Sequence, residues 1–144
     1  MPRLDAERIG LWRQFCQTSA ALQRNVDQQL SEEHFISLAW FECLAAIRDA
    51  GGAMRVHELA ESLGELPSSL SRRLDRLEQE GYVRRKRTPL PDDRRAVSVS
   101  LSASGRAAWR DANITYRRMV QQHFAQSLTE TDIVALQRVF TKLA

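Results

Sequence analysis

Residues 67–95 read PSSLSRRLDRLEQEGYVRRKRTPLPDDRR. They contain nine of the chain's 21 Lys and Arg residues but only five of its 18 Asp and Glu residues. Within this stretch Leu70, Leu74 and Leu77 recur at steps of four and three residues, as one face of a helix requires. The stretch therefore predicts a helix that packs on a core and also presents a cationic surface.

The periodicity of apolar residues changes after Gly81. Residues 82–88, YVRRKRT, and residues 96–101, AVSVSL, read as strands, because apolar residues alternate with serines in the second of them. The Pro- and Asp-rich segment 89–95 joins the two. We therefore expect a β-hairpin directly after the cationic helix.

Helical periodicity covers the rest of the chain. A short helix, a tight turn, a second helix and a hairpin in this order form a helix-turn-helix followed by a wing. The expected fold is mainly α (α+β): a winged helix-turn-helix with a two-stranded β wing between N- and C-terminal helices. The expected helices run from Leu4 to about Leu30, from Ser37 to Gly51, over residues 55–64, from Pro67 to Gly81, and onward from Ser102 and from Thr129 or Thr131.

The face of the fourth helix opposite its leucines is polar. Hydroxyls near a helix start can approach phosphates, and the paired donors of arginine match the two acceptors of a guanine edge. This face therefore suits the major groove of DNA. The alternative is a solvated surface in which Arg72 pairs with Asp75 and Arg76 with Glu80, and the cationic strand 84–87 can equally protect a sheet edge. The wheel places Ser68, Arg72, Asp75, Arg76 and Gln79 opposite the leucines, with Ser69, Ser71 and Arg73 on the flanks.

The stretch ELAESLGELPSSLSRRLDRLEQEGYVRRKR, followed by DDRRAVSVSLSASG, resembles the winged helix-turn-helix of the MarR family of bacterial transcriptional regulators. The most specific part is the wing motif, Asp-x-Arg, then alternating apolar residues, then Leu-Ser-x-x-Gly. The resemblance extends over nearly the whole chain, and SLAWFECLAAI resembles the family's second helix. The motif residues here are Asp93, Arg95, Val97, Val99, Leu101, Ser102 and Gly105.

The resemblance implies which residues contact DNA. An arginine of the wing would enter the minor groove, with Asp93 positioning the arginine beside it. Two positions depart from the family pattern: Arg73 stands where an apolar residue is common, and Glu65-Leu66 replaces an apolar-hydroxyl pair. We expect Arg73 to be an extra phosphate contact rather than a sign of a rotated helix. The candidate DNA-binding residues are Ser68, Ser69, Ser71, Arg72, Arg73, Arg76, Asp93, Arg94 and Arg95.

The resemblance also implies an organisation into lobes within one domain, residues 1–144. Residues 1–36 and 102–144 would form dimerisation helices around a DNA-binding lobe, residues 37–101. The partners would then be a second copy of the chain and double-stranded DNA with a pseudo-palindromic operator, because one short helix reads too few bases. The usual arrangement in the family is repression.

A small aromatic or lipophilic effector that relieves repression is a further expectation from the resemblance. The family has a cavity between its lobes, and aromatic residues of this chain fall on the corresponding helices, although a plain core is the alternative reading. A thiol-based sensor is another alternative, since some family members sense peroxide through a cysteine of the first helix, but we expect buried structural thiols. The candidate pocket residues are Trp12, Phe15, Cys16, Trp40, Phe41 and Trp109.

Composition limits the other classes. The net charge of +3 is too small to prove a polyanionic partner, but it is concentrated in residues 67–95. The six glycines form no phosphate-binding loop, and no nucleophile elbow is present, so we expect no enzyme. The histidines and cysteines lack metal-ligand spacing, so neither metal nor cofactor is expected.

The N-terminus lacks a signal peptide and no run could span a membrane, which predicts a cytoplasmic protein. A winged helix that docks a protein partner remains the functional alternative.

Overall fold

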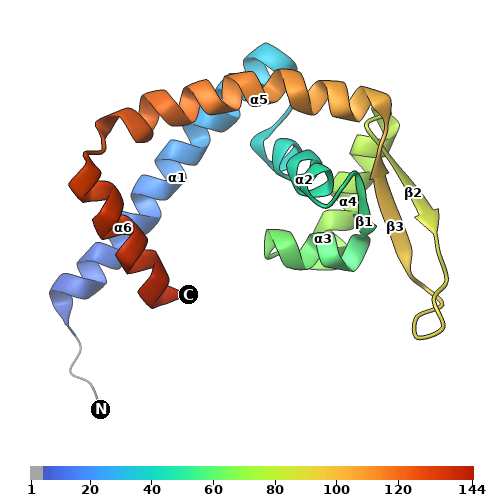
Figure 1. The fold of residues 1–144 in the computed structure, drawn as a ribbon, viewed down its shortest axis with the longest axis horizontal. Coiled ribbons are helices and arrows are strands. Elements are labelled where there is room, and N and C mark those ends of the chain that lie inside the picture. The colour runs from blue at the N-terminus through green and yellow to red at the C-terminus, as the bar shows by residue number, and fades with distance from the viewer. Residues whose placement is uncertain (1–4) are drawn as a thin grey trace.

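The computed structural model describes residues 5–144, which form an arch (Figure 1). Helix α5 spans the top of the arch, α1 and α6 form one limb, and the sheet with α2, α3 and α4 forms the other. The predicted start of the first helix, at Leu4, lies outside the described residues. The elements are α1 (Ala6–His34), α2 (Leu38–Asp49), β1 (Ala53–Arg55), α3 (Val56–Leu63), α4 (Pro67–Gln79), β2 (Val83–Arg87), β3 (Val97–Leu101), α5 (Ala103–His123), the 3-10 turn η1 (Ala125–Ser127) and α6 (Glu130–Leu143).

Local chemistry explains where the helices begin and end. The Ser37 hydroxyl accepts the amide of Trp40 at 3.1 Å and so caps α2. At α6 it is Thr129, not Thr131, that caps, because its side chain and that of Asp132 exchange hydrogen bonds with each other's amides. The first helix ends at His34, about one turn later than expected. Its last turns are held by bonds from Gln28 to Glu32 and from Gln29 to Glu33.

The sheet has three antiparallel strands, whereas the sequence predicted two. The order is β1-β3-β2, so the short strand β1 pairs with the outer edge of the predicted hairpin. Met54 of β1 lies opposite Val99, which in turn lies opposite Arg85 of β2. β1 immediately precedes α3 and β2 immediately follows α4, so both ends of the helix-turn-helix are attached to β3.

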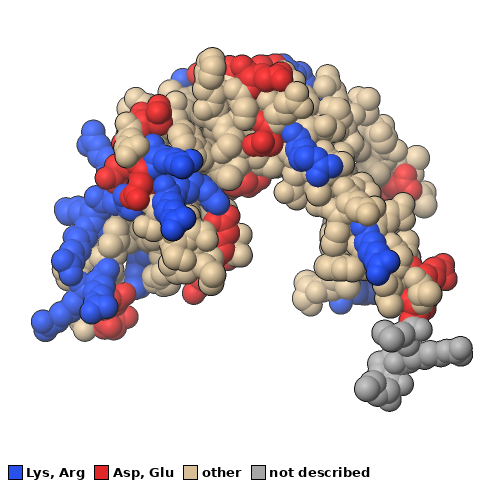
Figure 2. Space-filling view, turned by 180° about the vertical axis from the view of Figure 1, so that it is seen from behind, with Lys and Arg blue, Asp and Glu red and all other residues tan. Residues whose placement is uncertain are grey.

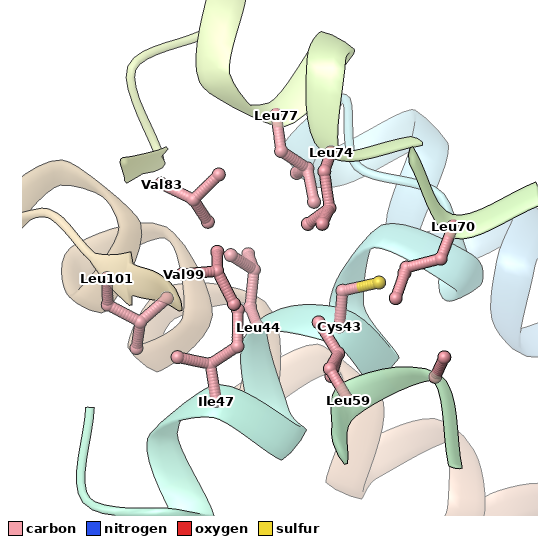
Figure 3. Close-up of a cluster of buried hydrophobic side chains, with 11 residues drawn as sticks. Cys43, Leu44, Ile47, Leu59, Leu70, Leu74, Leu77, Val83, Val99 and Leu101 are labelled. Atoms are coloured by element: carbon pink, nitrogen blue, oxygen red, sulfur yellow. The ribbon is translucent and has the colours of Figure 1, made fainter. Parts of the chain in front are cut away.

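The core of the sheet limb lies between α2, α3, α4 and the sheet (Figure 3). The three leucines of α4 are each 0% exposed and point toward α2 and the strands, which confirms the predicted apolar face. The cluster consists of Cys43, Leu44, Ile47, Leu59, Ala60, Leu70, Leu74, Leu77, Val83, Val99 and Leu101.

A second apolar cluster joins this limb to the long helices. It brings together α1, α2 and α5, with the ring of Phe41 stacked on that of Tyr116 at a centroid separation of 4.4 Å. At the start of α5, Gly105 lies directly against the turn that follows α4: a β-carbon at Gly105 would be 2.0 Å from the carbonyl oxygen of Tyr82. The glycine of the wing motif therefore permits this close approach.

A polar network ties α1 to α5 near the top of the arch. The buried hydroxyl of Thr115 donates to Oε2 of Glu33 at 2.6 Å, and Arg118 donates to Oε1 at 2.6 Å. The hydrogen bonds from Thr115, then Gln29, then Arg118 lower the pKa of Glu33 from 4.5 to about 2. His34 Nε2 lies 2.7 Å from the same hydroxyl. Among residues 5–144, no helix is both long and apolar enough to span a membrane.

Candidate nucleic-acid interface

The polar face of α4 is open to solvent. Its core side is filled by the three leucines, while the serines and two of the three arginines that the sequence singled out are exposed. The helix start also has free donors, because the N-cap residue Leu66 has no side chain that can cap and the first backbone bond runs from Leu70 to Leu66. A shallow pocket of about 200 Å³ opens here, lined by Ser68, Ser69 and Arg72. This start can therefore accept anionic oxygens.

The basic side chains of this lobe fall into two groups. Arg48, Arg55, Arg73 and Arg85 are held in ion pairs with carboxylates of the same lobe. Among residues 5–144 no carboxylate forms an ion pair with the second group, so the pairs of Arg72 with Asp75 and Arg76 with Glu80 are not formed. Asp75 instead binds Arg85. The second group comprises Arg72, Arg76, Arg84, Lys86, Arg87, Arg94 and Arg95.

None of these ion pairs was predicted from the sequence. Side chains alternate between the two faces of β2, so Arg85 lies on the same face as the buried Val83, two positions earlier. This face turns toward α4, where Arg85 also bonds Glu78 at 3.0 Å. That alternation was the signal in the sequence that could have separated Arg85 from its neighbours. Nothing in the sequence marks Arg55, which reaches the wing from β1.

The wing is held in shape by Asp93. Its Oδ1 accepts the amide of Arg95 at 2.9 Å, and its Oδ2 lies 3.7 Å from the guanidinium of Arg55. A pair of backbone bonds between Leu90 and Asp93 closes the tip. The side chains of Arg94 and Arg95 remain exposed beside this turn. The carboxylate of Asp93 thus orders the loop that carries both arginines.

Positive charge gathers over this limb. In the view of Figure 2, Lys and Arg atoms cluster on the limb that carries the sheet, at the left, whereas much of the opposite limb is uncharged. The charge concentration seen in residues 67–95 of the sequence is therefore also a concentration in space.

Arg73 does not fit the expectation of a phosphate contact. Its side chain is only 18% exposed, and its guanidinium binds Glu65 at 2.9 Å and approaches Sγ of Cys43 at 3.4 Å. The two departures from the family pattern therefore pair with each other. Because Glu65 neutralises the guanidinium of Arg73 within the lobe, Arg73 is not among the proposed DNA contacts.

The six candidate pocket residues do not converge on one cavity. Trp12 and Phe15 stack on each other with centroids 6.2 Å apart and are exposed on α1, beside the exposed Cys16. The others lie away from these two: Trp40 of α2 meets Tyr82 edge to face, Phe41 of α2 is buried, and Trp109 of α5 lies under the guanidinium of Arg48 at 4.0 Å.

The two cysteines differ in their surroundings. Cys43 is buried as expected, and burial raises the pKa of its thiol despite the nearby Arg73. A raised pKa keeps the thiol protonated, which disfavours a sensing role for Cys43. Cys16 is exposed, contrary to the expectation of a buried thiol.

Two clefts separate the limbs. The larger, of about 660 Å³, has a mixed lining of apolar and charged residues, with Arg24, Glu42, Glu65 and Arg73 among the charged ones. The smaller, of about 210 Å³, is mostly apolar and lies between α1, α2 and α5, with Leu22, Leu38, Tyr116 and Met119 among its lining.

The fold and its cationic face define a winged helix-turn-helix protein of the DNA-binding class. The MarR family model matches residues 36–97. The chain is 32% identical over 108 residues to the multiple antibiotic resistance protein MarR of Escherichia coli strain K12, covering 75% of this chain and 73% of that protein. The chain therefore belongs to the MarR family, whose members are transcription regulators and not enzymes.

Solved structures agree with this assignment. Sco3205, a MarR family transcriptional regulator from Streptomyces coelicolor in complex with DNA, is similar with a TM-score of 0.88 and 26% identity, covering 99% of this chain and 89% of that chain. The organohalide-sensing regulator RdhR-CbdbA1625, in its 2,4-dichlorophenol-bound form, has a TM-score of 0.80 and 26% identity, covering 99% and 84%. The DNA complex among these relatives supports DNA binding by this chain.

Proposed function

We propose that this chain is a sequence-specific repressor that binds a pseudo-palindromic operator as a homodimer. One observation carries the proposal. The basic side chains of the second group, which form no ion pair within residues 5–144, lie on the same limb as the start of α4, whose first amides are free to bind an anion. α4 would enter the major groove, where Arg72 and Arg76 contact base edges and Ser68, Ser69 and Ser71 contact the backbone. Arg94 or Arg95 of the wing would enter the flanking minor groove.

The apolar faces of the terminal helices support the homodimer. Trp12, Phe15 and Phe140 are 65%, 53% and 50% exposed, which is costly for an isolated chain. Residues of α1 and α6 line a common apolar groove of about 490 Å³, which includes Phe15, Leu136 and Phe140. A second copy would cover these surfaces and place a second recognition helix on the same side of the DNA.

An operator that overlaps a promoter would make the dimer a repressor, and a small apolar effector would release it. The apolar cleft between α1, α2 and α5 is the favoured site, because it lies where the limbs meet. The relative crystallised with 2,4-dichlorophenol makes an aromatic ligand a suitable first probe. Trp40 and Trp109 pack against the cluster that includes Phe41, so their fluorescence should respond when an aromatic acid or phenol fills this cleft.

The deciding experiment is fluorescence anisotropy with the DNA upstream of the chain's own gene and a scrambled duplex of the same composition, each over a salt series. Tight binding that weakens steeply with salt and favours the native duplex supports a sequence-specific regulator. Equal binding to both duplexes contradicts specificity for that DNA. No binding to either at low salt favours the alternative of a winged helix that docks a protein.

A further inference from the structure

Leu66 occupies an unusual position at the start of α4. It is the N-cap residue, where Ser, Thr, Asp or Asn would satisfy the free amides of the first turn, yet it forms no side-chain cap. Its side chain is 71% exposed. A single exposed leucine on a protein surface needs no explanation by itself, but an apolar side chain at this position gives up a capping bond.

The exposure of Leu66 is also exceptional within the lobe. Among residues 37–101, it is the only large apolar side chain that is exposed. The other exposed apolar residues belong to α1, α5 and α6 and to the short segments that follow them, and those in α1 and α6 fit the proposed dimer contact. That account does not extend to Leu66, which lies at the start of the recognition helix.

The neighbours of Leu66 keep its backbone in one place. Glu65 is tied on one side by its ion pair with Arg73 at 2.9 Å, and its amide donates to the carbonyl of Ala60 at 2.9 Å. On the other side Pro67 begins the helix, and the carbonyl of Leu66 accepts the amide of Leu70 at 3.2 Å. These contacts hold the backbone on both sides of Leu66, so its exposed side chain projects from a defined position just before Ser68 and Ser69.

The first residues of a recognition helix are those that reach base edges in the major groove. The one apolar group on those edges is the C5-methyl of thymine, and aliphatic side chains recognise it by contact. We propose that Leu66 reads a thymine methyl in each operator half-site and so determines specificity at that position. This inference rests on the proposed binding of operator DNA by α4.

Removal of the methyl alone tests the inference. In operator duplexes, each thymine is replaced in turn by deoxyuridine, symmetrically in both half-sites, and the affinities of the wild type and Leu66→Ala are compared. At roughly 0.8 kcal/mol per buried methyl, one symmetric replacement should weaken wild-type binding about fifteenfold, or about fourfold per half-site. The same replacement should have no effect on Leu66→Ala.

Two further variants separate base contact from folding and from general loss of apolar surface. Leu66→Ser supplies a capping hydroxyl, so its melting temperature should rise while its affinity for the thymine operator falls to that of Leu66→Ala. Ile114→Ala removes a side chain of similar exposure, 68%, from α5 and should retain the full deoxyuridine penalty.

Two results would overturn the inference, and they differ. If the wild type shows no preference for its operator over a scrambled duplex, the proposed function itself fails. If the preference holds but every deoxyuridine replacement affects wild type and Leu66→Ala equally, DNA binding stands and Leu66 reads no methyl.

Discussion

Glu65 and Arg73 form an ion pair across the start of the recognition helix, with carboxylate and guanidinium 2.9 Å apart and both side chains less than one third exposed. Glu65→Ala would leave the guanidinium with Cys43 as its remaining contact. We expect a loss of about 1 to 3 kcal/mol in the free energy of unfolding, measured with urea.

The double variant Glu65→Ala/Arg73→Met removes both charges and should regain most of that loss. Unchanged stability in Glu65→Ala, together with a shallower salt dependence of DNA binding in Arg73→Met, would restore Arg73 as a phosphate contact.

Gly105 has no room for a side chain. Because a β-carbon would lie 2.0 Å from the carbonyl oxygen of Tyr82, Gly105→Ala must push α5 away from the turn after α4. We expect a destabilisation of about 3 kcal/mol in urea unfolding. Gly10→Ala in α1 is the matched control: nothing lies within 4 Å of the added carbon, and stability should rise by roughly 0.5 to 1 kcal/mol. Equal effects at the two glycines would contradict this packing.

The low pKa of Glu33 predicts a dependence of stability on acid. Its pKa is about 2 in the folded chain, against an ordinary value of 4.5, because Thr115, Gln29 and Arg118 donate hydrogen bonds to the carboxylate. The contribution is fully present above about pH 5 and is lost as the pH falls toward 2. Glu33→Gln should therefore be less stable than the wild type at pH 7, and the difference should shrink in urea titrations at pH 3. A difference that stays constant with pH would show that Glu33 acts through packing alone.

The exposed arginines of α4 should distinguish base contacts from phosphate contacts. If Arg72 or Arg76 holds a base, its replacement by Ala should cost roughly 1 to 3 kcal/mol of binding energy for the operator and little for a scrambled duplex. An equal loss on both duplexes assigns the residue to phosphate. If each subunit neutralises about four phosphates, log K against log salt should have a slope of about −7 for the dimer. Arg117→Ala, which removes an exposed arginine of α5, is the control and should change neither quantity.

The dimer should depend on the apolar limb. Phe140→Ala removes an aromatic side chain that is half exposed in the single chain. If a second copy buries it, two such losses per dimer amount to roughly 3 kcal/mol or more and raise the dissociation constant at least about a hundredfold. Sedimentation equilibrium measures this directly. Phe35→Ala, at the end of α1, provides a comparison outside the groove, and equal effects of both variants would contradict the proposed interface.

Much of the fold follows from local patterns. The leucines of α4, the capping serines Ser37 and Ser102, and the alternation of β3 each act within a few residues, so sequence reasoning could place them. β1 could not be found this way, because three residues are too few to show alternation. It is a strand because it pairs with β3, whose position depends on the whole lobe.

The candidate site was predictable in part for the same reason. Periodicity shows which residues of α4 share a face, but it does not show which partner an arginine chooses. Arg72 and Arg73 are neighbours in sequence, yet Arg72 forms no ion pair within residues 5–144 and Arg73 is bound to Glu65 eight positions earlier. The aromatic residues likewise share helical spacing, but the arch places Trp12 and Trp40 on different limbs.

The central position of β3 has a mechanical consequence. The strand that leads into α3 and the strand that leaves α4 are both hydrogen-bonded to it, so the recognition helix and the wing form one rigid body. That body joins the rest of the chain at two places, where β3 runs into α5 and where α1 leads into α2. If a ligand fills the proposed cleft between the limbs, we expect the whole body to move at these connections, which would alter the spacing between two half-sites without altering the shape that reads each of them.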